Sequence, residues 1–404
     1  MFSLVCTNPS CGIELNPDNQ FFYCPECNAP LEVSYPKLIL DRDQVERKSG
    51  KPALHRYQSV LPHRDFQPHL FLGEGNTALV PSISLGSKWG VNRLYFKDER
   101  LNPTGSFKDR GTASTVQYLT ETEISKICTI SSGNMGLSVA AYAARTEYDC
   151  TVFVSEKTGE HKLAPISIHE PRLVRVSGGN YGEIVQKIFE ESARSGIYLI
   201  YSDNPYRLEG QKTTSYEIWE QLGFTEPDVV VVPTSSGGFI SSVIKGFSEL
   251  FQLDLIERIP EIVAVQMSGC APIAKAFQEK NDNVEPWQEP DTLAGAISNP
   301  LPHSGDLALR KLRKTGGRAI IVDDSEALEA QSLLAREEGI FGQPAAAVAT
   351  AAIKKMRSEG DLNPESLTVS VISGEGLKDP TVFDRHDLPS PSSTSIDELE
   401  QFFT

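Results

Sequence analysis

One lysine lies in a segment whose residue types could support covalent catalysis. Residues 102–111 read Asn-Pro-Thr-Gly-Ser-Phe-Lys-Asp-Arg-Gly, so Lys108 follows a tight turn fixed by Pro103 and Gly105. The run from Asp109 onward is typical of a helix, which places Lys108 at a helix start. A partly desolvated amine has a lowered pKa and becomes a nucleophile. Lys108 is therefore a candidate Schiff-base partner for an aldehyde cofactor, although a lone Ser-x-Lys is more often a surface lysine.

Two loops rich in serine and glycine each follow an apolar run and open a helix. The first is Ser131-Ser132-Gly133-Asn134-Met135-Gly136, and the second is Pro233-Thr234-Ser235-Ser236-Gly237-Gly238. Backbone N–H groups at a helix N-terminus bind anions, and small residues allow a close approach. The first loop could hold a carboxylate and the second a phosphate. Taken alone, each loop could equally be an ordinary turn and helix cap.

Four cysteines form a cluster near the N-terminus with the spacing C-x4-C-x12-C-x2-C: Cys6, Cys11, Cys24 and Cys27. Two close pairs of thiolates suit tetrahedral zinc, whose binding supplies folding free energy to a small module. A catalytic zinc is disfavoured because no ligand position stays open. There are two alternatives: a ribbon that has lost its metal, and a pair of disulfides if the chain is secreted. Three further cysteines lie in apolar settings and are interpreted as reduced core residues: Cys128, Cys150 and Cys270.

Composition limits the class of protein. The chain has 404 residues, 39% hydrophobic and 23% charged, which is typical of a globular protein of more than one domain. No apolar run reaches the ~20 residues that span a bilayer, and the N-terminus lacks the pattern of a signal peptide, so we expect a cytoplasmic protein. A net charge of −16 argues against nucleic acid as a partner. An anionic substrate would therefore need a local concentration of cations.

Short apolar, β-branched runs alternate with helical stretches from about residue 70. The predicted strands are 93–96, 126–130, 150–154, 173–176, 198–201, 229–232, 262–266, 318–322 and 367–372. The predicted helices are 109–122, 136–147, 181–195, 208–222, 239–251, 325–338 and 343–359. This alternation predicts an α/β fold with parallel sheets, and ligands bind beyond the carboxyl ends of such strands. The tail from residue 386 is predicted to be mobile, with a short helix over 396–403.

The segment around Lys108 is similar to the cofactor-lysine segment of pyridoxal-phosphate enzymes of the tryptophan-synthase-β type (fold type II), and most similar to that of threonine synthase and its close relatives. The resemblance extends over about residues 70–382 and includes the cysteine ribbon. Other matching segments are 72–77 (LGEGNT), 131–134 (SSGN), 202–213 (SDNPYRLEGQKT), 337–345 (EEGIFGQPA) and 373–380 (SGEGLKDP).

The resemblance implies two open parallel-sheet domains with the cofactor in the cleft between them, plus a small zinc-ribbon-like module. The module would span residues 1–35. The large domain would combine 36–109 with 211–385, the small domain would span 110–210, and residues 386–404 would form the tail. The resemblance also implies a homo-oligomer, specifically a dimer, that acts on a small amino-acid substrate without nucleic-acid or membrane partners.

The resemblance also assigns roles to single residues. Lys108 would be the catalytic residue and would carry pyridoxal 5'-phosphate. The other cofactor-binding residues would be Asn134, Thr234, Ser235, Ser236, Gly237, Gly238 and Ser373. The substrate-binding residues would be Ser131, Ser132, Gly133, Ser202 and Arg207. Structural zinc would be bound by Cys6, Cys11, Cys24 and Cys27.

Several positions depart from the family pattern and leave the substrate open. Glu375 replaces a His and Gln343 a Glu, while a donor that a phosphate could use is missing at Met135, Tyr201 and Phe239. The first choice is threonine synthase, which converts O-phosphohomoserine and water to threonine and phosphate. The alternatives are a β-replacement or β-elimination relative, such as cysteate synthase (phosphoserine and sulfite) or a hydroxyamino-acid dehydratase. A catalytically silent ligand-binding homologue is disfavoured because Lys108 and Asn134 are retained.

Overall fold

The computed structural model describes residues 2–17, 22–179, 181–388, 390–396 and 401–403. It begins with a small antiparallel sheet in the order β2-β1-β3, which we call the N-terminal module: β1 (Ser3–Cys6), β2 (Glu14–Leu15) and β3 (Leu31–Ser34). The short helices α1 (Arg42–Arg47) and α2 (Ala53–Arg56) lead from this module to the rest of the chain.

The larger sheet has six strands in the order β12-β11-β10-β13-β5-β4. All neighbours in it are parallel except the edge strand β4, which pairs antiparallel with β5. The strands are β4 (Leu79–Pro81), β5 (Arg93–Asp98), β10 (Val229–Pro233), β11 (Glu261–Met267), β12 (Arg318–Val322) and β13 (Leu367–Ile372).

Helices cover both faces of this sheet, which explains its continuous apolar strands. Side chains alternate between faces along a strand, so Val230 and Val232 join one core cluster while Val229 and Val231 join another. The first cluster includes residues of α8 (Pro205–Gln221), α9 (Gly238–Gln252), α10 (Pro272–Gln278) and α11 (Gly305–Lys314). The second includes residues of α3 (Leu85–Trp89), α12 (Asp324–Leu333) and α13 (Pro344–Glu359).

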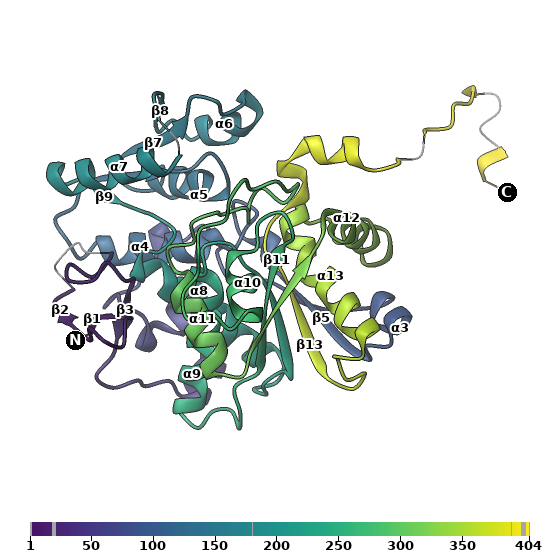
Figure 1. Ribbon diagram of the computed structural model, residues 1–404, viewed down its shortest axis with the longest axis horizontal. Helices are drawn as coiled ribbons and strands as arrows, with labels where there is room; N and C mark the ends of the chain where they lie inside the picture. The colour runs from purple at the N-terminus through teal and green to yellow at the C-terminus, as the bar shows by residue number, and fades with distance from the viewer. Residues whose placement is uncertain (1, 18–21, 180, 389, 397–400, 404) are drawn as a thin grey trace.

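The smaller sheet is parallel throughout, in the order β8-β7-β6-β9. Its strands are β6 (Lys126–Ile130), β7 (Asp149–Ser155), β8 (Arg172–Val176) and β9 (Tyr198–Leu199). Helices α5 (Asn134–Ala143) and α6 (Glu160–Ser167) share one core cluster with it, and α7 (Tyr181–Ser195) flanks the other face. In Figure 1 this unit lies at the upper left, directly above the N-terminal module.

Helix α4 (Lys108–Leu119) packs closely on α8. The two helices approach closely at Gly210, where an added Cβ would lie 2.1 Å from the carbonyl oxygen of Arg110. The N-terminal module shares a core cluster with this region, because Leu4 and Leu31 group with Tyr118 of α4 and Tyr206 of α8. The N-terminal module therefore packs into the same hydrophobic core as α4 and α8.

The α/β fold predicted from the sequence is confirmed, and each predicted strand coincides with an observed one. Helices α1, α2, α3, α6, α10 and α11, the edge strand β4 and the three strands of the N-terminal module were not predicted. Pro165 lies inside α6, where a proline interrupts a helical pattern read from sequence, and α10 has only 7 residues, too few for a clear pattern. The predicted helix over 396–403 includes residues 397–400, which lie outside the described residues.

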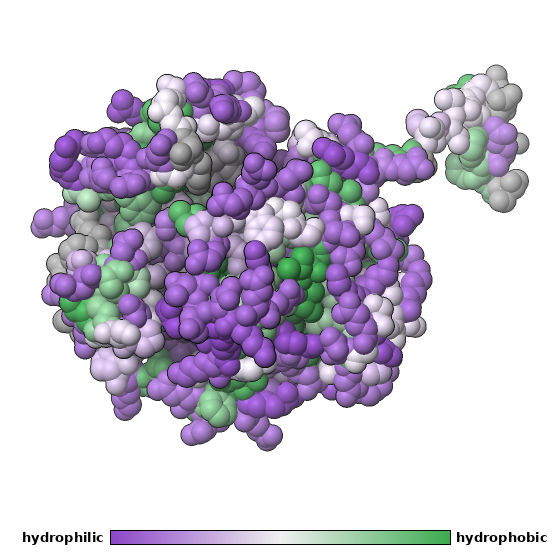
Figure 2. All heavy atoms as spheres, in the orientation of Figure 1, coloured by the Kyte–Doolittle hydropathy of each residue, from purple (hydrophilic) through white to green (hydrophobic). Residues whose placement is uncertain are grey.

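The face of the molecule drawn in Figure 2 is mostly hydrophilic, with apolar residues in small patches. Among the helices of the described ranges, none combines the length and apolar character that crossing a bilayer requires.

Candidate active site

A cavity of about 710 Å³ opens where several parallel strands end. The ends of β6, β10 and β13 and the starts of α4, α5 and α9 meet at its wall. Most residues predicted for the site line it: Lys108, Ser131, Ser132, Gly133, Asn134, Ser202, Thr234, Ser235, Ser236, Gly237 and Ser373. Gly238 and Arg207 are not part of the wall.

Lys108 opens α4 on a turn that is tied down on two sides. The backbone N–H and the hydroxyl of Thr104 both donate to the carboxylate of Asp109, each at 2.7 Å. The N–H of Phe107 donates to the carbonyl of Ser373, at the end of β13, over 3.2 Å. Burial, together with the positive charge of Arg207, lowers the pKa of Lys108 to about 7, against the opposing charge of Asp203. A neutral, nucleophilic amine is therefore accessible near neutral pH.

The loop after β6 faces Lys108 from the smaller sheet. The N–H of Ser131 continues the sheet by donating to the carbonyl of Phe153 at 3.1 Å, and α5 begins at Asn134. Among the described residues no N-cap side chain bonds to this helix start, so the first N–H groups of α5 are available to a ligand. Asn134 donates from Nδ2 to Oε1 of Gln343 at 2.9 Å, which fixes its amide at the cavity wall.

The loop after β10 approaches the cavity through a glycine in the left-handed region. Gly237 has φ +93°, and an added Cβ would lie 2.4 Å from the carbonyl oxygen of Ser304. Only glycine fits there, and α9 starts immediately afterwards without a side-chain cap. Thr234 is tied to the sheet by its N–H, which donates to Val265 at 2.9 Å. The arrangement leaves a helix N-terminus facing the cavity, as an anion site requires.

Arg207 lies behind Lys108, outside the cavity wall. The cap at Asn204, which accepts from the N–H groups of Tyr206 and Arg207, starts α8 and directs Arg207 toward α4. The fully buried guanidinium donates to the hydroxyl of Thr112 at 2.7 Å and to the carbonyl of Lys108 at 3.3 Å. Ser202, by contrast, lines the cavity.

Three cations that the sequence interpretation did not single out also line the cavity: Lys162, Lys378 and Arg385. Lys378 is half-buried and donates to the carbonyl of Thr104 at 2.7 Å, and burial lowers its pKa to about 8. Asp379 is the single carboxylate among the described lining residues. The sequence position of Lys378 could have indicated that it lies at the cavity, because it follows the last strand at the same carboxyl edge as Ser373.

These residues fit a cofactor that carries an aldehyde and a phosphate. Lys108 offers an amine of lowered pKa, and the Gly237 turn brings an uncapped helix start to the same cavity. Phe107 and Phe239 stack on each other beside this site, with ring centroids 4.0 Å apart, and add an apolar surface to the wall. The Lys108 amine therefore suits the aldehyde of pyridoxal phosphate, and the start of α9 suits its phosphate.

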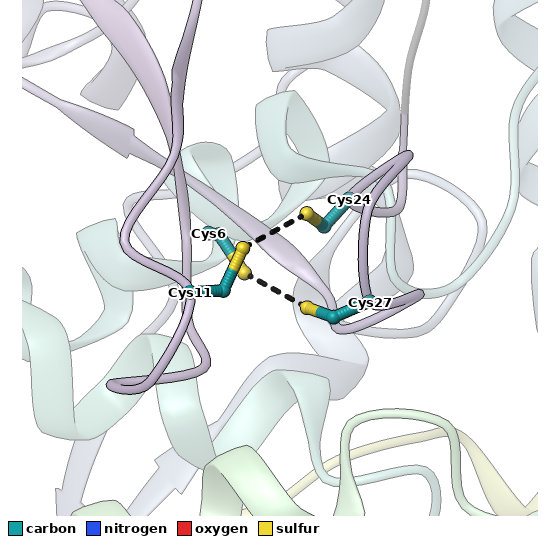
Figure 3. Close-up of side chains that lie close together, drawn as sticks. All are labelled: Cys6, Cys11, Cys24 and Cys27. Atoms are coloured by element: carbon teal, nitrogen blue, oxygen red, sulfur yellow. Dashed lines mark hydrogen bonds between the residues drawn. The ribbon is translucent and has the colours of Figure 1, made fainter.

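The four N-terminal cysteines converge on one point (Figure 3). Their sulfur atoms all lie within 4.8 Å of one another, and the Cys6–Cys27 and Cys11–Cys24 pairs are 3.4 and 3.6 Å apart. All four are free thiols without a disulfide. Zinc–sulfur bonds of ~2.3 Å in a tetrahedron place sulfurs about 3.8 Å apart, so the cluster has the size of a metal site.

The match to a protein-family model decides the family. Residues 70–374 match the model described as pyridoxal-phosphate dependent enzyme. The chain belongs to this family. The matched residues include Lys108, both helix-start loops and Ser373. The family match therefore covers the main wall of the cavity in this pyridoxal-phosphate-dependent enzyme.

Similar proteins agree with this assignment. The chain is 37% identical to a threonine synthase of Methanocaldococcus jannaschii, covering 92% of each chain, and 33% identical to one of Methanosarcina acetivorans, covering 99% of this chain and 98% of the other. Among solved structures, threonine deaminase isoform 2 of Solanum lycopersicum matches with a TM-score of 0.69 at 21% identity, covering 90% and 97%. Maize serine racemase matches with a TM-score of 0.65 at 22% identity, covering 86% and 98%. At these identities the solved structures support the fold alone.

Proposed function

We propose that this enzyme is a threonine synthase, a lyase that converts O-phosphohomoserine and water to threonine and phosphate. The similarity to threonine synthases over nearly the whole chain carries the proposal. The cavity supports it, because one wall combines an activated lysine, two uncapped helix starts and several cations.

Bound pyridoxal phosphate would supply an aldehyde that reacts with amines and an electron sink for charge developing at Cα. Lys108 would hold this group through its amine, and its free amine would take the proton from Cα. The Ser131–Gly133 loop at the start of α5 would bind the substrate carboxylate, which orients Cα toward Lys108. Asn134, Ser373 and the Ser235–Gly238 loop would hold the ring and the phosphate.

The cations in the wall favour a substrate with a second anionic group. Lys162, Lys378 and Arg385 concentrate positive charge at one cavity of a chain whose net charge is −16. A phosphate on the substrate side chain would be attracted to this region. Ser202 would contact it from the end of β9, and Arg207 would add positive charge from one layer behind.

A second candidate is elimination from an unphosphorylated hydroxyamino acid. Two observations favour it. Met135 presents a thioether in the wall where the family resemblance leads us to expect a hydroxyl, and the Arg207 guanidinium lies outside the wall, bonded to Thr112 and the Lys108 carbonyl. A dianion at this place would lack both donors, each worth about 1.5–3 kcal/mol when charge-assisted.

Turnover assays with single substrates separate these two functions. Threonine and phosphate should form from O-phosphohomoserine, whereas serine and threonine should yield no 2-oxoacid. Met135→Thr restores a hydroxyl and serves as the companion variant. Efficient 2-oxoacid formation from serine or threonine, with no reaction of O-phosphohomoserine in either enzyme form, would replace the first proposal by the second.

We further propose that the four cysteines hold a structural zinc, that the domains divide at residues 35, 110, 210 and 385, and that the enzyme is a cytoplasmic homodimer. The sulfur geometry supports the first point and the two separate sheets support the second. Metal analysis of the purified chain tests the zinc, limited proteolysis tests the boundaries, and light scattering tests the dimer.

A further inference from the structure

Tyr23 of the N-terminal module projects between the two larger units of the molecule. Its ring centroid lies 5.7 Å from that of Phe189, on α7 of the smaller unit, and 5.8 Å from that of His303, just before α11 of the larger one. Tyr23 directly precedes the metal-site residue Cys24 in sequence. A folded cysteine module therefore places this ring where both units meet.

The Tyr23 hydroxyl starts a short chain of hydrogen bonds that runs inward. It donates to Oδ2 of Asp203 at 3.3 Å, and the hydroxyl of Ser304 donates to Oδ1 of the same carboxylate at 2.7 Å. Asp203 is 1% exposed and Ser304 is fully buried. Asp203 thus links the N-terminal module to the segment that leads into α11.

Ser304 in turn packs against the loop at the start of α9. Its N–H donates to the carbonyl of Ser236 at 3.1 Å, and its carbonyl oxygen is the atom that an added Cβ on Gly237 would meet at 2.4 Å. Asp203 reaches the same loop, since Oδ1 would lie 3.3 Å from a Cβ added to Gly238. Ser304 and Asp203 together form the support on which the Ser235–Gly238 loop rests.

Asp203 is held by these hydrogen bonds and by no ion pair among the described residues. The basic side chains near it are Lys108, Arg207 and His303, and burial raises the pKa of the Asp203 carboxyl. Because no cation locks the carboxylate, its orientation depends on the Tyr23 and Ser304 hydroxyls.

We propose that Tyr23, Asp203 and Ser304 are positioning residues, through which the N-terminal module holds the Ser235–Gly238 loop in the geometry that binds the cofactor phosphate. The proposal rests on the role of this loop given under Proposed function. It gives the cysteine module a task in the active site that goes beyond its own folding. Loss of the Tyr23 hydroxyl should loosen the loop and leave Lys108 and the ring contacts in place.

Two ligands that differ only in the phosphate isolate this effect. The full-length chain, freed of cofactor but retaining its metal, is titrated with pyridoxal 5'-phosphate and with pyridoxal, and binding is followed by visible absorption. Tyr23→Phe and Ser304→Ala each remove one hydrogen bond of the chain. Each should weaken pyridoxal phosphate binding about threefold to tenfold and pyridoxal binding less than about twofold.

Tyr35→Phe is the matched control. The Tyr35 hydroxyl also joins the N-terminal module to α8, donating to Oε2 of Glu209 at 2.7 Å, but it does not lead to the cofactor loop. This variant should bind both ligands like the wild type. Metal content and melting temperature, measured for all three variants, show that each chain is folded and metal-loaded when it is compared.

Two results would overturn the proposal. In the first, Tyr23→Phe binds pyridoxal phosphate as tightly as Tyr35→Phe does, so that Tyr23 merely docks the module. In the second, the Tyr23→Phe and Ser304→Ala variants lose affinity equally for both ligands, so that the change does not reach the phosphate loop. Neither result bears on the reaction catalysed, because a wrong function would appear as missing turnover in a wild type that binds the cofactor normally.

Discussion

The side-chain amide of Asn134 donates to the side-chain oxygen of Gln343 over 2.9 Å, joining the first residue of α5 to the residue that caps α13. The two lie 209 positions apart in the chain. Gln343 is itself anchored, because its N–H donates to the carbonyl of Gly374 at 2.9 Å, just beyond β13. The bond therefore fixes an amide at the cavity wall from the end of the opposite sheet.

Gln343→Ala should lower cofactor affinity or kcat about threefold to tenfold, because Asn134 loses the acceptor that orients it. Gln343→Glu keeps an acceptor at the same place and should restore most of the loss. Cofactor titration and steady-state kinetics on both variants provide the measurement. If alanine and glutamate behaved alike, the hydrogen bond to Asn134 would not be the reason for any effect.

The lowered pKa of Lys108 predicts how attachment of pyridoxal phosphate depends on pH. The unprotonated amine is the nucleophile, so the attachment rate should rise with pH and reach half its maximum near pH 7, the lowered pKa, instead of near the ordinary 10.5. Stopped-flow absorption of the cofactor-free chain measures this midpoint.

Lys108→Ala should show neither covalent attachment nor turnover while keeping its fold, and appreciable activity of this variant would refute the assignment.

Arg207→Ala tests whether a buried cation tunes Lys108. Removing its charge removes one of the two causes that lower the pKa of Lys108, so the attachment midpoint should move up by about one pH unit. If Arg207 also reaches the substrate phosphate, KM for O-phosphohomoserine should rise about tenfold or more, and KM for an unphosphorylated amino acid should not. Arg64→Ala, at a side chain that is 76% exposed, is the control and should change neither quantity.

The cysteine cluster predicts a specific loss of metal. Cys24→Ser should release about one zinc per chain and lower the melting temperature, because a bound metal would contribute folding free energy to a module this small. Cys128→Ser replaces a cysteine that is also buried but lies outside the cluster, and it should leave the metal content unchanged. Equal metal content in the wild type and Cys24→Ser would show that these thiols hold no ion.

The sequence predicted the parts of this molecule that rest on local patterns. Four consecutive valines identified β10 because a strand buried on both faces must be apolar at every position. The loops at Ser131 and Ser235 were found because glycine and serine before a helix start allow an anion to approach its N–H groups closely. Both features are encoded within a few neighbouring residues.

Relationships between distant segments could not be predicted in this way. Arg207 matched a substrate-binding motif, yet its guanidinium points to Thr112 because α4 and α8 cross closely at Gly210. No sequence pattern singled out Tyr23. Its hydroxyl meets Asp203, 180 residues further along the chain, only because the N-terminal module packs against the rest of the fold. Helix packing and module docking determine such contacts, and neither follows from spacing along the chain.

The centre of the molecule also holds a buried ionic network, which predicts a large and pH-dependent effect on stability. Glu217 binds Arg110 at 2.6 Å and Lys97 at 2.8 Å, and all three side chains are at most 1% exposed. Glu217→Gln leaves two buried cations short of a counter-charge and should lower the free energy of unfolding by about 3–5 kcal/mol. Urea unfolding measures this loss. Glu191→Gln breaks an ion pair whose carboxylate side chain is 41% exposed, and it should lower the free energy of unfolding far less because solvent screens that pair.

The pH dependence follows from the same contacts. Burial raises the pKa of Glu217, but the charges of Arg110 and Lys97 outweigh burial and hold the pKa below its ordinary 4.5. A carboxyl with a lowered pKa in the folded state contributes its stability above pH 4.5, and that contribution is lost as the pH falls toward the folded-state pKa. The difference in stability between the wild type and Glu217→Gln should therefore be constant from pH 8 to about 5 and shrink below it. A difference that stayed the same down to pH 3 would show that the packing of Glu217, and not its charge, supports the fold.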